Sequence, residues 1–483
     1  MKSSKFIQVL STLNESEFKD FEKIAVQSFY NNEKMLSFIE FLSFHYPDFE
    51  EESISKINAF KYVYKDGEEF KDIRIREMLS ALNKIVKDFL VFNELRNSDF
   101  YYELDLLKQY KKRDLENLYQ IQLKVLKDIL EKDTFKNKEY YKRTFLLASE
   151  ENEHFTAKHI RTLDENIQIK VDNLDFYYFS TKLKESCEML NRQRMLNQQY
   201  QFHLFEEIED LIEKNRDGYL KQATILCYYE IYKLLISEDN VTQLEICIKT
   251  LNKNTSNFTG EELKAMYDFP QNYCIAHVNK GNEKYTELLF DLQRFLVDKS
   301  FNMVNGYISH ISYRNIVTIA LKLKKFDFSQ DFIEKFKNKV APEFKENTYN
   351  MNKANLYYSL KDYDNTITLL NQIEFTDTYY AYYSKVLLLK TYYASAEFET
   401  LAYFITAFKL NIKRNKELPA LYKKGADLFL SNFKKIFNIA EKIDFLETKK
   451  VNEKLTSISK EIQAEKNIHN RVWLLEIIEE LRK

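Results

Sequence analysis

Glu151 and His154 are the pair of residues whose spacing best suits a catalytic or metal-binding site on a helix. A Glu-x-x-His sequence places a carboxylate and an imidazole on one helix face, but a di-metal site in a helix bundle needs two such pairs and two further glutamates. No other histidine has a glutamate three positions before it. We therefore expect Glu151 and His154 to lie on a solvated helix face.

Other reactive residue types occur without the companions that their chemistry needs. Ser-x-x-Lys occurs at Ser53–Lys56, Ser431–Lys434 and Ser457–Lys460, but the sequence contains neither Ser-Asp-Asn nor Lys-Thr-Gly. No two of the six glycines lie within twenty positions of each other, which excludes a glycine-rich loop for phosphate. The sequence therefore predicts a protein that is not an enzyme and that holds no cofactor or metal.

Composition favours an all-α protein. Among 483 residues there are only 6 Gly and 4 Pro, whereas sheets need such turn-forming residues far more often. The formal net charge of −2 provides no global field to attract DNA or an anionic membrane, and no run of eighteen apolar residues could span a bilayer. The four cysteines are scattered, so we expect buried, reduced thiols in a cytoplasmic protein: Cys187, Cys227, Cys247 and Cys274.

A repeated pattern organises the chain from about residue 313 to residue 413. An acidic and an aromatic residue stand together three times, at Asp327-Phe328, Asp362-Tyr363 and Glu397-Phe398. Each step between these aromatics measures 35 positions. A fixed period of this size, with a helix on each side of a short polar turn, is typical of a helix-hairpin solenoid.

The middle unit, Asn350 to Thr378, resembles a tetratricopeptide repeat (TPR). Tyr357, the Lys361-Asp362-Tyr363-Asp364 turn and Ile367 fall at that repeat's Tyr, Gly-Asp-Tyr and second-helix core positions. The resemblance implies that the aromatic after each acidic turn residue packs between the helices of its unit and against the next unit. The whole succession is also similar to a group of helical-repeat proteins of Bacteroidetes-type bacteria, through Asn272-Tyr273-Cys274-Ile275, Asn279-Lys280-Gly281-Asn282 and the Asp362-Tyr363 unit.

Four segments are expected along the chain. Residues 1–96 form an N-terminal helical unit, in which Asn14 and Glu17 have the spacing of a capping box. Residues 97–254 form long antiparallel helix hairpins, residues 255–418 contain the TPR-like repeats, and residues 419–483 cap the solenoid. Whether 97–254 are true repeats stays open. The last helix carries an expected apolar stripe of Val472, Leu475, Ile478 and Leu481.

The leading functional hypothesis is a non-enzymatic scaffold or adaptor that binds a protein or peptide in a concave groove. The resemblance implies that the inner helix of each pair lines this groove, which gives as candidate positions Lys324, Asn355, Tyr358, Lys390 and Tyr393. Lysine and asparagine can hold a peptide backbone or carboxylate, and tyrosine supplies a rigid anchor. Alternatively, the two tyrosines pack between repeats. The oligomeric state stays open.

A second hypothesis, a nucleic-acid-associated regulator, rests on residues 401–440. This segment has eight basic and two acidic residues, with five aromatic rings interleaved: Phe404, Phe408, Tyr422, Phe429 and Phe433. Cations for phosphate combined with exposed rings for bases are typical of nucleic-acid surfaces. The alternative is that these rings belong to the core and the cations to a solvated face. The candidate anion-binding cations are Lys409, Lys413, Arg414, Lys416, Lys423 and Lys424.

Overall fold

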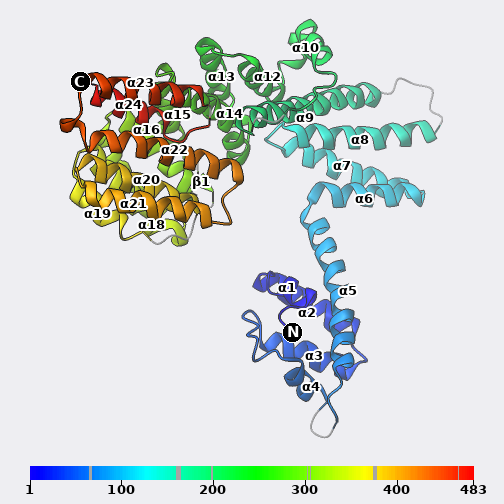
Figure 1. Ribbon diagram of the computed structural model, residues 1–483. Helices are drawn as coiled ribbons and strands as arrows, with labels where there is room; N and C mark the ends of the chain where they lie inside the picture. Colours follow the sequence, from blue (N-terminus) through cyan, green and yellow to red (C-terminus); the bar gives the residue numbers. More distant parts are fainter. Residues whose placement is uncertain are drawn as a thin grey trace. The chain divides into compact units, whose positions relative to one another are not determined.

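A computed structural model (Figure 1) describes the chain at residues 1–64, 68–158, 165–196, 199–301, 303–304, 306–373, 378–465 and 467–482. Within these ranges it contains 24 α-helices and three short 3-10 segments. Two two-residue strands, β1 (Met303–Val304) and β2 (Tyr307–Ile308), pair in antiparallel orientation. The expected all-α fold class is confirmed.

Packing divides the described chain into two compact units, one of residues 1–134 and 138–177 and one of residues 135–137 and 178–483. The division falls inside the long helix α9. The helices from the N-terminus to this point are α1 (Lys5–Leu10), α2 (Glu15–Ser28), α3 (Glu33–Phe44), α4 (Lys56–Tyr64), α5 (Asp72–Asn97), α6 (Asp99–Lys112), α7 (Glu116–Lys132), α8 (Lys138–Ala157) and α9 (Asn166–Leu196).

The second unit continues with fifteen further helices, which follow one another through short connections. They are α10 (Phe205–Lys214), α11 (Arg216–Tyr219), α12 (Ala223–Ile236), α13 (Val241–Lys253), α14 (Gly260–Asn279), α15 (Lys284–Asp298), α16 (His310–Lys322), α17 (Phe326–Phe336), α18 (Pro342–Ser359), α19 (Tyr363–Leu370), α20 (Thr378–Ala394), α21 (Phe398–Arg414), α22 (Ala420–Ala440), α23 (Thr448–Ala464) and α24 (Arg471–Leu481).

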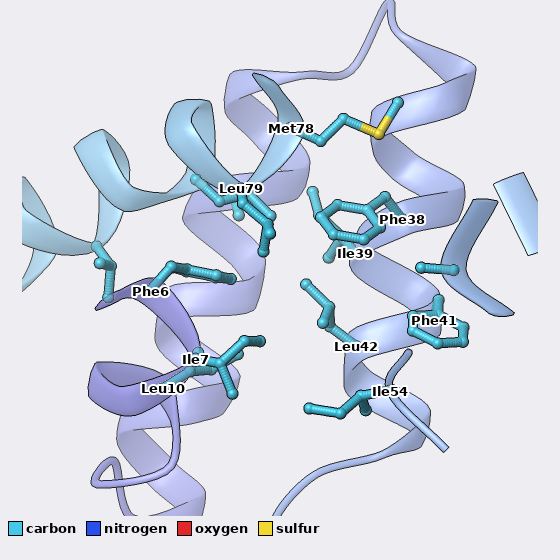
Figure 2. Packing of buried hydrophobic residues seen from close by; sticks show 14 of the residues in the cluster. Phe6, Ile7, Leu10, Phe38, Ile39, Phe41, Leu42, Ile54, Met78 and Leu79 are labelled. Atoms are coloured by element: carbon cyan, nitrogen blue, oxygen red, sulfur yellow. The ribbon is translucent and has the colours of Figure 1, made fainter. Parts of the chain in front are cut away.

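The first five helices share a hydrophobic core of their own. Apolar side chains from α1, α3 and α5 meet in this core (Figure 2), where Phe38 and Ile54 are fully buried. The predicted capping box begins α2: Asn14 Oδ1 accepts from the Glu17 amide at 3.0 Å, and Glu17 Oε2 accepts from the Asn14 amide at 2.9 Å. These bonds satisfy two backbone donors that the helix itself leaves free. Every buried residue of this core lies between Phe6 and Phe89.

In the second unit, helices pack both with their neighbours in sequence and with the next helix but one. The pairs α16·α17, α18·α19 and α20·α21 are hairpins, and α16 also packs on α18, as does α18 on α20. Each first helix of a hairpin therefore buries its apolar side chains against its own partner and against the next hairpin. Such mutual burial is why a single hairpin of this kind is not stable alone.

The three hairpins close with the same backbone turn. Lys324, Lys361 and Ala396 adopt φ values of 57°, 62° and 58°, in the left-handed region that non-glycine residues seldom occupy. The amide of the residue that follows donates to the carbonyl five residues before it, and the nitrogen–oxygen distance is 2.9 Å in all three hairpins. The pairs are Lys325 to Ala320, Asp362 to Tyr357, and Glu397 to Tyr392. This is the Schellman bond, which satisfies a helix carbonyl left free at the C-terminus.

The shared turn corrects the repeat register of the first hairpin. In each hairpin, the residue two positions after the left-handed residue is aromatic and begins the second helix. These residues are Phe326, Tyr363 and Phe398. The residue equivalent to Tyr363 is therefore Phe326 rather than Phe328, and the first step measures 37 positions instead of 35. The sequence misleads because Asp327 has a phenylalanine on both sides, so either ring completes an acidic–aromatic pair.

Ring contacts show how the three predicted turn aromatics pack. Each is partly buried. Phe328 meets the edge of Phe290 in α15 at 4.9 Å, Tyr363 lies 6.0 Å from Tyr358, and Phe398 lies 5.7 Å from Phe437 in α22. Phe328 thus contacts the preceding hairpin, and Phe398 contacts the following helix.

Helices α20 to α24 share one hydrophobic core, which crosses the expected boundary at residues 418 and 419. The segment before α24 is anchored on α22 at Gly425, whose carbonyl accepts from the His469 amide at 3.4 Å. A Cβ on Gly425 would lie 2.7 Å from the Asn467 carbonyl oxygen, so only glycine allows this approach. His469 Nδ1 is also hydrogen-bonded to the Tyr382 hydroxyl at 2.8 Å. These contacts fix where α24 begins.

Candidate functional site

Three of the predicted groove residues lie together, on a surface that α24 covers. Tyr393 packs its ring 6.1 Å from the Trp473 ring, and the Lys390 Nζ atom lies 4.9 Å from the centre of the same indole. Tyr358, at the end of α18, is close enough to Glu476 and Glu480 for their charges to act on it. The C-terminal ends of α18 and α20 therefore contact α24 of the same chain.

The residues of α24 that face this surface form one stripe. Trp473, Glu476 and Glu480 are spaced by three and four positions, which places them on one side of a helix. The adjoining side carries Leu474 and Ile478, which are fully buried in the core of α20 to α24. The helix thus packs by its apolar side and meets Tyr358, Lys390 and Tyr393 with a mixed aromatic and acidic side.

Burial changes the ionisation of the lysine on this surface. Loss of hydration lowers the pKa of Lys390 to about 8, and the Glu476 carboxylate opposes this change. The indole face of Trp473 compensates in part, because the negative face of an aromatic ring attracts an ammonium. Burial likewise raises the pKa of Tyr358 and of Tyr393 to about 12. These three side chains are half-buried at a helix interface.

The other two predicted groove residues lie elsewhere. Lys324 is the exposed left-handed residue of the turn between α16 and α17, so it is not on an inner helix. It was assigned through the register that placed Phe328 with Tyr363, and the corrected register moves it into the turn. Asn355 is half-buried on α18, where its Nδ2 donates to the Met351 carbonyl at 3.0 Å. This amide donor is engaged by its own helix.

The predicted cationic surface lies at the end of α21 and the start of α22. Lys409, Lys413, Arg414, Lys416 and Lys424 are exposed, and Lys423 is half-buried. Lys409 forms an ion pair with Asp427 at 3.2 Å and donates to the Ser431 hydroxyl at 3.1 Å.

The rings expected beside these cations lie mostly inside the protein. Phe408, Phe429 and Phe433 are no more than 2% exposed. Phe404 packs against Tyr392 at 5.6 Å, and Tyr422 packs against His469 at 4.5 Å. These five rings belong to the core side of α21 and α22, as the alternative explanation of this segment predicted.

Sequence reasoning missed two exposed hydrophobic side chains on α21. The side chains of Tyr403 and Leu410 are 79% and 46% exposed. The signal was available in the helix period, because Leu401 and Phe408 lie on the buried side and each exposed residue follows one of them by two positions. Two positions correspond to about 200° around a helix, which is the opposite face. The outer side of α21 thus combines exposed hydrophobic side chains with the cations Lys409, Lys413 and Arg414.

The expected solvated position of Glu151 and His154 is wrong. His154 stacks on the buried Tyr119 ring at 3.9 Å, and its Nε2 lies 3.2 Å from Glu116 Oε2. Glu151 pairs with Lys127 at 2.6 Å. Both α8 side chains are therefore half-buried against α7, because the two helices pack on this face.

Within the described ranges, no group of three or more His, Cys, Asp or Glu residues has the arrangement of a metal site. The four cysteines are buried, as predicted.

None of the helices in the described part of the chain combines the length and apolar character that crossing a membrane requires. Comparison of the chain with protein-family models, with curated proteins and with solved structures gave no match.

Proposed function

We propose that this chain is a non-enzymatic, TPR-like helical-repeat scaffold that binds a protein or peptide partner. The three hairpins with a common Schellman turn support the repeat assignment. The predicted concave positions Tyr358, Lys390 and Tyr393 meet α24. The proposal therefore moves the partner to the outer side of α21, which we call the α21 face: Tyr403, Thr406, Ala407, Leu410, Lys413 and Arg414.

The observation that carries this proposal is the exposure of Tyr403 and Leu410 on one helix face. A tyrosine that is 79% exposed contributes little to the fold, but its large amphipathic ring is a typical binding anchor. Between the anchors lie the small exposed residues Thr406 and Ala407, which allow a partner backbone to approach closely. Lys413 and Arg414 continue the same face toward its C-terminal end.

The charge of the α21 face selects the chemistry of the partner. Cations at a helix C-terminus already stabilise the helix dipole, and a carboxylate-bearing partner would add charge-assisted contacts to them. An amphipathic acidic helix offers apolar residues for Tyr403 and Leu410 and carboxylates for Lys413 and Arg414. The proposed partner segment is therefore an acidic amphipathic helix.

Site-specific crosslinking in the native host tests this function. A photoreactive phenylalanine derivative replaces Tyr403 in the full-length chain, and the same replacement at Tyr379, which is 41% exposed, is the control. We expect a partner crosslinked at position 403 and not at 379, with the attachment site in an acidic amphipathic segment. Capture that is equal at both positions, or absent at 403, would refute the proposal.

A nucleic-acid-associated role is the second candidate, and the exposed cations of α21 and α22 with the Tyr403 ring favour it. The buried rings of Phe408, Phe429 and Phe433 are not available to stack on bases. Phosphate-driven binding weakens steeply with salt, whereas a contact anchored by apolar side chains weakens less. Titration with single-stranded DNA and RNA at two salt concentrations separates the two roles, because tight binding with a steep salt slope would favour the second.

A further inference from the structure

An open pocket of ≈ 340 Å³ lies in the first unit, where the beginnings of α1 and α4 meet α5. Helix α5 contributes one polar stripe to it, because Arg76, Ser80 and Asn83 are spaced by four and three positions and share a helix face. The most buried residues of the lining are Phe6 of α1 and Leu79 of α5, which belong to the core in Figure 2. The pocket thus has polar side chains around a floor that the hydrophobic core holds in place.

The charges that line this pocket all have the same sign. Lys5, Lys56 and Arg76 come from three different helices, and no acidic residue is among the described residues of the lining. The chain as a whole has 72 basic and 74 acidic residues, so the excess of positive charge is local. Cations gathered around one concave surface attract an anion, because their fields add there.

Asp72 holds two of these cations in place from outside the lining. Its Oδ1 lies 2.7 Å from Lys56 Nζ, and its Oδ2 lies 2.6 Å from Arg76 Nε. The two terminal amino groups of the Arg76 guanidinium and two N–H groups of the Lys56 ammonium therefore remain as donors. Lys5 is exposed and forms no ion pair with any residue of the described ranges. With Asp72 included, the site keeps an excess of two positive charges.

Charge restricts the ligand to a class of anion. A phosphate monoester carries a charge of about −1.5 to −2 at neutral pH, which matches the excess, whereas a carboxylate would neutralise only half of it. The planar guanidinium binds two phosphate oxygens at once, and ammonium groups bind a phosphate as point charges.

The remainder of the pocket restricts the group to which the phosphate is attached. Small-molecule sites have volumes of roughly 300–1,000 Å³, so this pocket has room for a small molecule beyond its phosphate. Ser80 and Asn83 offer a hydroxyl and an amide, and Phe6 and Leu79 offer apolar surface. A sugar ring combines hydroxyl groups with apolar C–H groups, and therefore matches both kinds of lining.

We propose that this pocket binds a phosphate monoester of a small sugar. Lys5, Lys56 and Arg76 hold the phosphate, while Ser80 and Asn83 hydrogen-bond to the sugar hydroxyls. The site belongs to the first unit and is independent of the partner proposed for the α21 face.

Calorimetric titration of the full-length protein with glucose 6-phosphate and with ribose 5-phosphate tests the assignment. We expect saturable binding of at least one of them, at least about tenfold tighter than that of inorganic phosphate, and no binding of glucose. Arg76→Gln should weaken this binding at least about tenfold, because it removes a charged donor to the phosphate. Arg96→Gln, an exposed position of the same helix outside the pocket, removes the same charge and should leave the affinity unchanged.

Two further variants keep the test decisive. Lys5→Gln changes an exposed side chain, should also weaken binding, and replaces Arg76→Gln if that variant fails to fold. Asn83→Ala should weaken binding of the sugar phosphate but not of inorganic phosphate, because the amide contacts the sugar alone.

Three results would overturn the assignment. The first is that neither sugar phosphate binds at millimolar concentration. The second is that inorganic phosphate binds as tightly as both of them, or that Arg76→Gln and Arg96→Gln weaken binding equally. The third is tighter binding of single-stranded RNA than of either sugar phosphate with the same dependence on Arg76, which would make the pocket part of a nucleic-acid surface.

Discussion

The inner surface of α20 and the outer surface of α21 belong to one hairpin and use the same residue types, yet they differ in what meets them. On the inner surface, Lys390 and Tyr393 pack on Trp473 of α24. On the outer surface, Tyr403 and Leu410 are exposed beside Lys413. The difference teaches that a lysine–aromatic combination does not by itself mark a binding surface, because another segment of the same chain can cover it.

The largest effect should come from loosening the helix that covers the inner surface. Ile478 is fully buried in the core of α20 to α24, so Ile478→Ala removes apolar contacts and leaves a cavity. We expect a loss of about 2–5 kcal/mol in the free energy of unfolding. Trp473 is the single tryptophan, so urea unfolding followed by its fluorescence reports directly on α24. Leu410→Ala on the outer surface is the control and should cost no more than about 0.5 kcal/mol.

A smaller effect is expected where the segment before α24 meets α22. Gly425→Ala places a methyl group 2.7 Å from the Asn467 carbonyl oxygen and from the His469 ring. Such overpacking should cost about 1–3 kcal/mol. In the control Gly260→Ala, the new Cβ meets nothing within 4 Å, and the variant should be as stable as the wild type or gain about 0.4–1 kcal/mol. Calorimetric melts of both variants check this, and equal melting temperatures would show that the contact at Gly425 is not tight.

The pH dependence of stability distinguishes a covered lysine from an open one. The pKa of Lys390 is about 8 in the folded chain and about 10.4 in an unfolded one. Between these values the unfolded state binds more protons, so the wild type gains stability as the pH rises, whereas below pH 8 the penalty for the buried charge is constant. Lys390→Met abolishes this gain.

Urea unfolding at pH 7.5 and at pH 9.5 measures how much the free energy of unfolding rises with pH. We expect this rise to be about 1–2 kcal/mol larger for the wild type than for Lys390→Met. Lys390→Arg, whose guanidinium stays charged, should also lack the gain. A difference between wild type and Lys390→Met that is the same at both pH values would mean that the ammonium is hydrated and the inner surface open.

The smallest effect on stability is expected for the outer anchor. Tyr403→Ser removes a ring that is 79% exposed and should change the free energy of unfolding by no more than about 0.5 kcal/mol. Tyr393→Ser removes a ring packed on Phe433 at 5.6 Å and on Trp473, and should cost several times as much. Thermal melts of the pair decide the comparison. Equal losses would show that Tyr403 is part of a packed interface within the chain.

Much of the fold could be predicted from local chemistry. The scarcity of glycine and proline predicted an all-helical chain, and the Asn14–Glu17 spacing predicted the start of α2. The register of the first hairpin could not be predicted, because it depends on which residue takes the left-handed conformation. Asp327 lies between two phenylalanines, and only the closed turn at Lys324 shows that α17 begins at Phe326.

The candidate site was predictable in part for a related reason. Tyr358, Lys390 and Tyr393 occupy comparable places near the ends of α18 and α20, and the structure brings them together. The packing of α24 on these residues was not predictable, since the apolar side expected for this helix differs from the side that is buried in the structure. Val472 is 57% exposed, whereas Leu474 and Ile477, which were not in the expected stripe, are buried. Long-range packing decides between two apolar sides of one helix, and local spacing does not record it.

The packing of α24 on α20 also has a consequence during translation, because the ribosome synthesises α20 well before α24. Tyr393 and Trp473 are 80 positions apart. At about 5–20 residues per second, translation takes on the order of 4–16 s to cross this interval. During that interval the nascent chain presents Tyr358, Lys390 and Tyr393 without the indole that later shields them. A chaperone that recognises exposed aromatic side chains would thus have its opportunity at this surface before α24 emerges.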